Sequence, residues 1–277
     1  MSAFEDLGIQ NPIYQSGLAD LDKMMIGFEP GTLTLLAGRP SMGKSAIAMI
    51  LAFKHLINYK LPVAFFSLEM TKKQLEYRLW SQMSVQSFYK HHGVEPISGD
   101  RLRRHRAGIE PLTQQELNKI AIIADLACKL PLYINDDRRS TVASIGSNCR
   151  QLKNKVGRLG LVIVDYLQMM SDDASDNRSY ELGAIARGLY QLSSEIEVPV
   201  IALSQVNRAV ETRQDKRPTM ADLSQSGILE MVADNIIFAY RDEYYFEGSN
   251  EQNILELILR KARHGSTGTA KVFFDKE

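Results

Sequence analysis

The stretch "LLAGRPSMGKSAIAMI" (35–50) constrains this chain most strongly, because an apolar run leads into a glycine-rich turn and then into a helical pattern. Gly38 is followed, after four residues, by Gly43, Lys44 and Ser45, which is the spacing of a phosphate-binding loop. Backbone N–H groups in such a loop surround phosphate oxygens, and the next helix adds the positive end of its dipole. A phosphate-binding loop lies between a strand and a helix, and both are predicted here. A glycine turn that matched the spacing by chance would not need these flanking elements.

The loop supplies the expected phosphate-binding residues, which are Gly38, Arg39, Pro40, Ser41, Met42, Gly43, Lys44 and Ser45. Gly43 allows the backbone to approach phosphate closely, Lys44 neutralises charge between the β- and γ-phosphates, and Ser45 is an expected ligand of Mg²⁺. Asp165 ends the apolar run "LVIVD" (161–165). Together with an upstream phosphate loop, its carboxylate is the expected second half of the Mg²⁺ site.

Apolar runs alternate with helical patterns along most of the chain, which predicts an α/β fold with a mostly parallel central sheet and helices on both faces. The last strands lack intervening helices, so we expect the sheet to finish antiparallel. The segment 88–112 is polar without clear periodicity, and its basic run "RLRRHR" (101–106) is typical of a solvated face. Strands are predicted at 32–38, 62–70, 132–136, 161–165, 199–205, 235–240, 254–262 and 271–275, and helices at 45–59, 71–87, 113–130, 142–156 and 179–196.

Charge and cysteine content narrow the class of protein. The 277 residues carry 33 Lys and Arg against 33 Asp and Glu, so any contact with nucleic acid must be local. The longest apolar run, 46–53, is too short to span a bilayer, and the first ten residues lack a hydrophobic signal region. Cys128 and Cys149 show no metal-binding spacing and are expected to be reduced thiols. We expect a cytoplasmic protein without membrane contact.

Two further polar residues end predicted strands. Glu69 in "FFSLEM" could orient an attacking water, but from the pattern alone it could equally be a solvated acid that opens the next helix. Gln205 could sense the γ-phosphate through its amide, or simply end a strand. Lys261 and Arg263 are two residues apart, so on a strand they would point the same way. Such a pair suits insertion into a neighbouring subunit's nucleotide site.

Several separated stretches together resemble the C-terminal motor domain of DnaB-type replicative helicases, a group of RecA-like P-loop ATPases. The resemblance covers residues 15 to 275 in family order, and "DYLQ" and "LSQVNR" are much more specific than a phosphate loop. The stretches are "GRPSMGKS", "FFSLEM", "LVIVDYLQMM", "PVIALSQVNRAVETR", "KRPTMADL", "FAYRDEYY" and "KARHGSTG".

The resemblance implies a role for each matching residue. Lys44, Ser45 and Asp165 would bind ATP with Mg²⁺, Glu69 would be the catalytic carboxylate, and Gln205 the γ-phosphate sensor. Lys261 and Arg263 would be supplied in trans across the interface of a homo-oligomer, a hexameric ring in the full assembly. The family also implies single-stranded DNA as a ligand, and a primase or a helicase loader as partners.

The chain departs from the family in two places. We expect residues 1–14 to be an N-terminal remnant or linker and 15–277 the motor domain, since the family's N-terminal helical domain and linker helix do not precede the match. The DNA-facing loop of the family reads Leu-Arg-Glu-Ser-Gly, whereas this chain has "LSQSG" within 223–234. The expected DNA-binding residues are Ser224, Gln225 and Gly227, and we expect weak, sequence-independent contact with single strands.

Three hypotheses follow from these residues. The first is a ring-forming ATPase that translocates on single-stranded DNA, which the near-complete motor set favours. The second is a RecA-like ATPase that serves as a regulatory or assembly factor, which the altered loop 223–234 favours. The third, a P-loop kinase of small molecules, is disfavoured by the position of Glu69 and by a basic pair suited to act in trans.

Overall fold

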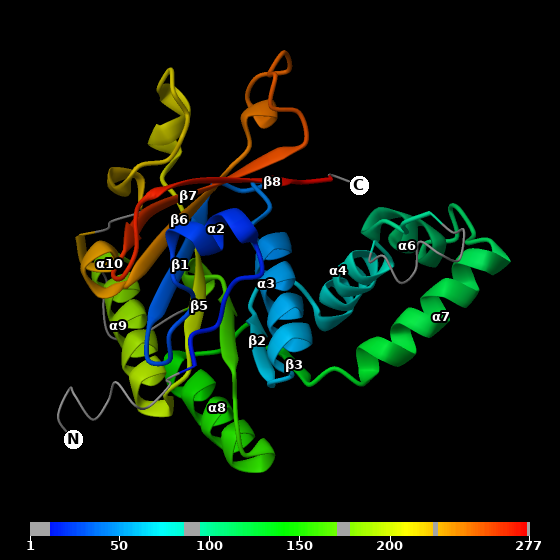
Figure 1. The fold of residues 1–277 in the computed structure, drawn as a ribbon, viewed down its shortest axis with the longest axis horizontal. Coiled ribbons are helices and arrows are strands. Elements are labelled where there is room, and N and C mark those ends of the chain that lie inside the picture. Colours follow the sequence, from blue (N-terminus) through cyan, green and yellow to red (C-terminus); the bar gives the residue numbers. More distant parts are fainter. Residues whose placement is uncertain (1–11, 86–94, 171–177, 224–226, 276–277) are drawn as a thin grey trace.

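Apolar runs of five or six residues form the central strands, because parallel strands are covered by helices on both faces. The computed structural model describes residues 12–85, 95–170, 178–223 and 227–275. Eight strands form one sheet in the order β3-β2-β4-β5-β1-β6-β7-β8 (Figure 1). Their bounds are β1 Leu33–Gly38, β2 Val63–Ser67, β3 Leu132–Asn135, β4 Leu161–Asp165, β5 Val200–Gln205, β6 Asn235–Tyr240, β7 Ile254–Ala262 and β8 Gly268–Phe273.

The direction of the strands confirms the predicted sheet. All neighbours from β3 to β6 pair in parallel, and β7 and β8 add an antiparallel end. The helices are α2 Ala19–Met24, α3 Lys44–Tyr59, α4 Lys72–Ser84, α6 Gly99–Arg106, α7 Gln114–Cys128, α8 Val142–Val156, α9 Arg178–Ile196 and α10 Gly227–Val232. β8 begins three residues earlier than predicted, because its register with β7 starts at Gly268, opposite Leu259.

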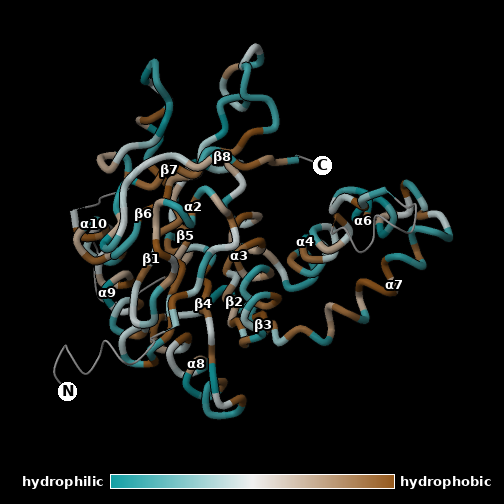
Figure 2. The backbone as a smooth tube through the Cα atoms, viewed as in Figure 1, coloured by the Kyte–Doolittle hydropathy of each residue, from teal (hydrophilic) through white to brown (hydrophobic). Residues whose placement is uncertain are grey.

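Side chains that alternate along β1 define two buried cores. Leu35 belongs to the cluster that α8 and α9 complete, and Leu36 belongs to the cluster under α3 and α4. This alternation follows from the two-residue period of a strand. In Figure 2 the apolar residues concentrate along these strands, while the loops that extend beyond β7 and β8 are mostly hydrophilic.

The segment between α4 and β3 differs from the prediction. Residues 86–94 lie outside the described part, but residues 99–106 form α6, where no helix was predicted. Ser98 accepts the Arg101 N–H as the N-cap, and Leu102 packs with Ile97 and Leu112 in a small third cluster. In Figure 1, α6 and α7 lie beside α4, away from the sheet.

The basic run lies on the exposed surface of α6, as a solvated face requires. Arg103, Arg104 and Arg106 are exposed, and Arg104 pairs with Glu110. A capping box begins α7, since Thr113 and Glu116 each accept the other's backbone N–H. None of the described helices is long and apolar enough to cross a membrane.

Candidate nucleotide-binding site

The register of the sheet gathers the predicted motor residues at one edge. Gly38 at the end of β1 lies opposite Gln205 at the end of β5, and Ser67 at the end of β2 lies opposite Asp165 at the end of β4. Parallel strands that end together form the crevice where α/β proteins bind ligands. The phosphate loop begins at this edge and leads into α3.

The backbone of the phosphate loop requires glycine where the sequence provides it. Gly43 is the N-cap of α3 and has φ of 87°, in the left-handed region that favours glycine. A Cβ at this position would also meet the ring of Phe274 at 2.9 Å. The bare backbone therefore leaves the first amides of α3 accessible to an anion.

Lys44 lies folded into the loop. Its Nζ donates to the carbonyl oxygens of Gly38 at 2.8 Å and Arg39 at 2.9 Å. Burial lowers the pKa of Lys44 to about 8, although the carboxylates of Asp165 and Glu69 oppose this shift. A phosphate group would replace both carbonyls as the partner of this ammonium group, since it carries full negative charge.

Asp165 has the properties of a metal-binding carboxylate. It is 1% exposed, and within the described residues its Oδ2 has no hydrogen-bond partner. Burial raises the pKa of Asp165, while a hydrogen bond from Ser45 lowers it. A buried acceptor oxygen without a donor, next to a serine hydroxyl, provides the oxygen ligands that Mg²⁺ prefers. The residues present therefore fit this ion, which Ser45 and Asp165 would hold.

Glu69 lies beyond β2, so the prediction that it ends the strand was wrong. The strand stops at Ser67, and Leu68 N donates to the carbonyl of Asp165 at 2.7 Å, which holds the following turn beside β4. The Glu69 side chain is exposed, and its carboxylate raises the pKa of both Asp165 and Tyr166. It therefore lies within electrostatic reach of the buried carboxylate and remains accessible to water.

Gln205 is held in place by a residue to which the sequence assigned no role. Gln168 accepts the Gln205 backbone N–H at 3.0 Å and donates to Ser204 at 3.0 Å. Tyr166 shares a hydrogen bond with the Gln205 side chain, and this bond lowers the pKa of Tyr166, which burial raises. The signal for both residues was the motif "DYLQ", which places them directly after Asp165.

Arg78 on α4 is a second residue that the sequence did not indicate. Burial lowers the pKa of its guanidinium, and the carboxylates of Asp165 and Glu69 raise it. One turn further along α4, Gln82 donates to the carbonyl of Ala46 at 3.2 Å, which joins this face to the first turn of α3. Arg78 and Gln82 are four residues apart, so they share one face of the helix beside its apolar positions. This spacing is the sequence signal that could have indicated Arg78.

A family comparison decides which class of nucleotide-binding protein this is. The family model described as DnaB-like helicase C terminal domain matches residues 14–277. The chain belongs to this family.

Similar proteins extend the match. This DnaB-like domain is 40% identical over 267 residues to a "Probable replicative DNA helicase" of Trieres chinensis, and 38% identical over 264 residues to "Replicative DNA helicase DnaB" of Geobacillus stearothermophilus. These matches cover 94% and 95% of this chain but 55% and 54% of the relatives. The chain thus spans about half the length of the curated relatives it matches.

Solved structures show the same fold. A structure of an ATPase domain superposes with a TM-score of 0.86 at 34% identity, covering 99% of this chain and 93% of that chain. A DnaB-like replicative helicase, described with its interactions with primase, gives a TM-score of 0.87 at 34% identity. That match covers 99% of this chain and 64% of the solved one.

The basic pair of the DnaB-like domain lies far from its own phosphate loop. Lys261 pairs with Ile236 near the start of β6, at the edge opposite the nucleotide site. Lys261 Nζ donates to the carbonyl of Glu230 at 2.7 Å, and Arg263 Nη1 binds Asp234 at 2.6 Å. From Leu33 to Gly38, the two ends of β1, the strand is about 17 Å long at 3.3 Å per residue. These two cations therefore do not reach the site of the same chain.

The predicted DNA-binding residues are only partly described. Ser224 and Gln225 lie outside the described residues, and Gly227 is the first residue of α10. Upstream of them, Arg213 binds Asp222 at 2.7 Å and Arg217 binds the buried Glu256 at 2.7 Å.

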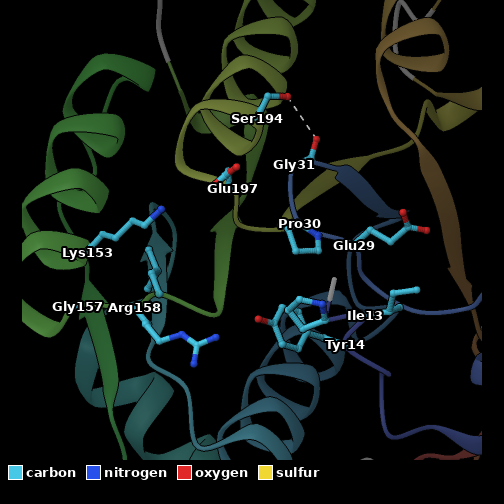
Figure 3. A pocket seen from close by; sticks show the side chains of 12 residues that line it. Ile13, Tyr14, Glu29, Pro30, Gly31, Lys153, Gly157, Arg158, Ser194 and Glu197 are labelled. Carbon is cyan, nitrogen blue, oxygen red and sulfur yellow. Dashed lines mark hydrogen bonds between the residues drawn. The ribbon is translucent and has the colours of Figure 1, made fainter. Parts of the chain in front are cut away.

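A groove of about 590 Å³ lies at the edge of the sheet opposite the nucleotide site (Figure 3). Gly31 precedes β1, Leu159 precedes β4 and Glu197 precedes β5, so the groove lies at the amino ends of these strands. Figure 3 shows Lys153 and Arg158 on one side of it and Tyr14 on another. Because no phosphate-loop residue lines this groove, it is distinct from the site described above.

Proposed function

We propose that this chain is the motor domain of a replicative DNA helicase, which hydrolyses ATP in a ring and couples hydrolysis to movement along single-stranded DNA. The arrangement at the carboxyl edge of the sheet supports this proposal. There a phosphate loop, a buried carboxylate with one oxygen that no described residue hydrogen-bonds, an exposed carboxylate and a glutamine held by Gln168 come together.

Each group has a chemical task at this edge. Lys44 leaves the two backbone carbonyls and neutralises phosphate charge, and the amides at the start of α3 bind phosphate oxygens. Glu69 accepts the proton of the attacking water, because it is exposed and lies near Asp165. Mg²⁺, when held by Ser45 and Asp165, supplies positive charge that stabilises the phosphoryl group in transfer.

The basic pair completes the site of a neighbouring subunit. Lys261 and Arg263 border a depression of about 530 Å³ that Arg187 and Tyr190 also line. A cation supplied in trans stabilises the charge that develops on the transferred phosphoryl group. This arrangement requires a homo-oligomer, for which we propose the hexameric ring.

Single-stranded DNA is the proposed ligand of the loops at the nucleotide edge and of residues 224–227. We expect backbone contacts without reading of bases, because the altered loop offers few cations. We also propose a primase as partner, since a solved relative is described with its interactions with primase. We further propose that a helicase loader is a partner and that the protein is cytoplasmic.

A second candidate function rests on the same altered loop. Ser224 stands where the family has arginine, which favours an ATPase that regulates or assembles a helicase without unwinding DNA itself. The rate of ATP hydrolysis with and without single-stranded DNA separates the two. Stimulation supports the motor, whereas hydrolysis that is indifferent to DNA supports the regulator. A Lys44→Ala chain, measured in parallel, gives the background.

A further inference from the structure

One arginine connects the phosphate loop to the loop that follows β5. Arg39 directs Nε to Oε1 of Glu211 at 2.8 Å and Nη1 to the carbonyl of Val206 at 3.2 Å. Its side chain is 11% exposed, whereas that of Glu211 is 40% exposed. Charge-assisted bonds of a largely buried guanidinium are stronger than those of a fully exposed ion pair.

Residues 206–223 form a cross-braced unit. Asp222 receives Arg213 Nη2 at 2.7 Å, and Lys216 Nζ donates to the carbonyl of Glu211 at 2.9 Å. An antiparallel bridge between the first and last residues closes the base of the loop. A displacement of Glu211 is therefore passed to the rest of the loop.

The backbone of Arg39 takes part in the nucleotide site. Its carbonyl accepts Lys44 Nζ at 2.9 Å, and the lysine must leave this carbonyl when it turns to phosphate. The Arg39 peptide then loses one of its restraints. Because the side chain of the same residue holds Glu211, the change at Lys44 reaches the loop through a single residue.

We propose that the Arg39–Glu211 ion pair couples occupancy of the nucleotide site to the position of loop 206–223. The inference rests on the proposed function in one respect, which is that DNA is the ligand bound by this loop. Coupling between two binding sites is reciprocal, so DNA on the loop would also alter nucleotide affinity by the same factor. Loss of the ion pair should therefore weaken the communication more than it weakens either binding event.

Hydrogen exchange of the full chain tests the coupling without DNA. In the wild type, a non-hydrolysable ATP analogue with Mg²⁺ should slow amide exchange in the phosphate loop and change it in 206–213. In Glu211→Gln, the change in the phosphate loop should persist, while the change in 206–213 should fall by at least half. Glu195→Gln is the matched control, because it removes another Arg–Glu pair, with Arg150 on α8.

DNA binding gives a second measurement. In the wild type, the analogue should change the affinity for single-stranded DNA, and in Glu211→Gln this change should be several-fold smaller. The affinity of Glu211→Gln for the analogue itself should stay within about twofold of wild type. Combining Arg39→Glu with Glu211→Arg should restore part of the exchange response. A Glu211→Gln chain with wild-type exchange in 206–213 and an unchanged affinity ratio overturns the inference. If the wild type binds no DNA, the proposed function fails, and the exchange response alone still decides the coupling.

Discussion

Glu69 combines an exposed carboxylate with electrostatic reach to the buried Asp165. Glu69→Gln should keep ATP binding and lose turnover by about 100-fold or more, because an amide does not accept the proton of water. Equilibrium binding of a fluorescent nucleotide and steady-state hydrolysis measure the two effects. Glu195→Gln on α9 should hydrolyse ATP at the wild-type rate. Hydrolysis by Glu69→Gln at that same rate would remove Glu69 from its assigned role.

His55 on α3 makes the stability of the protein depend on pH. It is 2% exposed, contacts Tyr14 and Tyr59 edge-on or tilted, and its Nε2 has no hydrogen-bond partner among the described residues. Burial lowers the pKa of His55 to about 4 from 6.5. The unfolded chain therefore binds the extra proton between these values, so stability is complete above pH 6.5 and is lost as the pH falls.

Between pH 7 and pH 5 this histidine should lower the free energy of unfolding by about 2 kcal/mol. His55→Phe keeps an aromatic ring in place and removes the titration. Urea unfolding at both pH values should therefore show a smaller difference for this variant than for wild type. His264→Gln, at an exposed position, is the control and should behave as wild type. An equal pH dependence in His55→Phe and wild type contradicts the assignment.

We predict that the loop containing Ser224 contributes to the affinity for single-stranded DNA. Ser224→Arg restores a cation at the family position, so it should tighten binding to single strands. Each added phosphate contact should steepen the log–log salt dependence by about 0.7. Fluorescence anisotropy at several salt concentrations measures both quantities, and Gln151→Arg, at an exposed position on α8 away from the nucleotide edge, controls for net charge. If the control matches Ser224→Arg, the loop is not the contact.

At the level of elements, hydrophobic periodicity correctly predicted the bounds of helices and strands that carry long apolar patterns. β6, β7 and α8 have the bounds expected from sequence, because each carries enough apolar residues to fix its face and its ends. α6 was missed because its eight residues bury only Leu102, and its cluster partners Ile97 and Leu112 lie outside it. α2 and α10, of six residues each, are similarly too short for a periodic signal.

At the scale of the whole molecule, the order of the strands along the chain does not give their order in the sheet. The motifs identified the phosphate loop, Asp165 and Gln205, but strand order β2-β4-β5-β1 places them side by side only in the folded sheet. The contact between Arg39 and Glu211 joins residues 172 positions apart. Gln82 and Gln168 acquire their positions through hydrogen bonds to α3 and β5, which no local pattern reports.

Because Lys261 and Arg263 lie far from the phosphate loop of the same chain, we predict that efficient hydrolysis requires an oligomer. If Arg263 acts in trans, the specific rate should rise with protein concentration, because only oligomers contain complete sites. Sedimentation velocity on the same samples relates this rate to the fraction of oligomer. A specific rate independent of oligomer fraction would mean that the isolated chain carries a complete site.

Mixing two inactive chains tests the central claim most directly. Arg263→Ala lacks the trans cation and Lys44→Ala lacks the phosphate-loop lysine, so each alone should hydrolyse ATP only at background rate. Mixed oligomers contain interfaces that pair an intact phosphate loop with an intact Arg263, and ATP hydrolysis on single-stranded DNA should recover to a measurable fraction of wild type. Mixed oligomers, verified by pull-down of differently tagged chains, that remain at background would contradict a motor with sites shared between subunits.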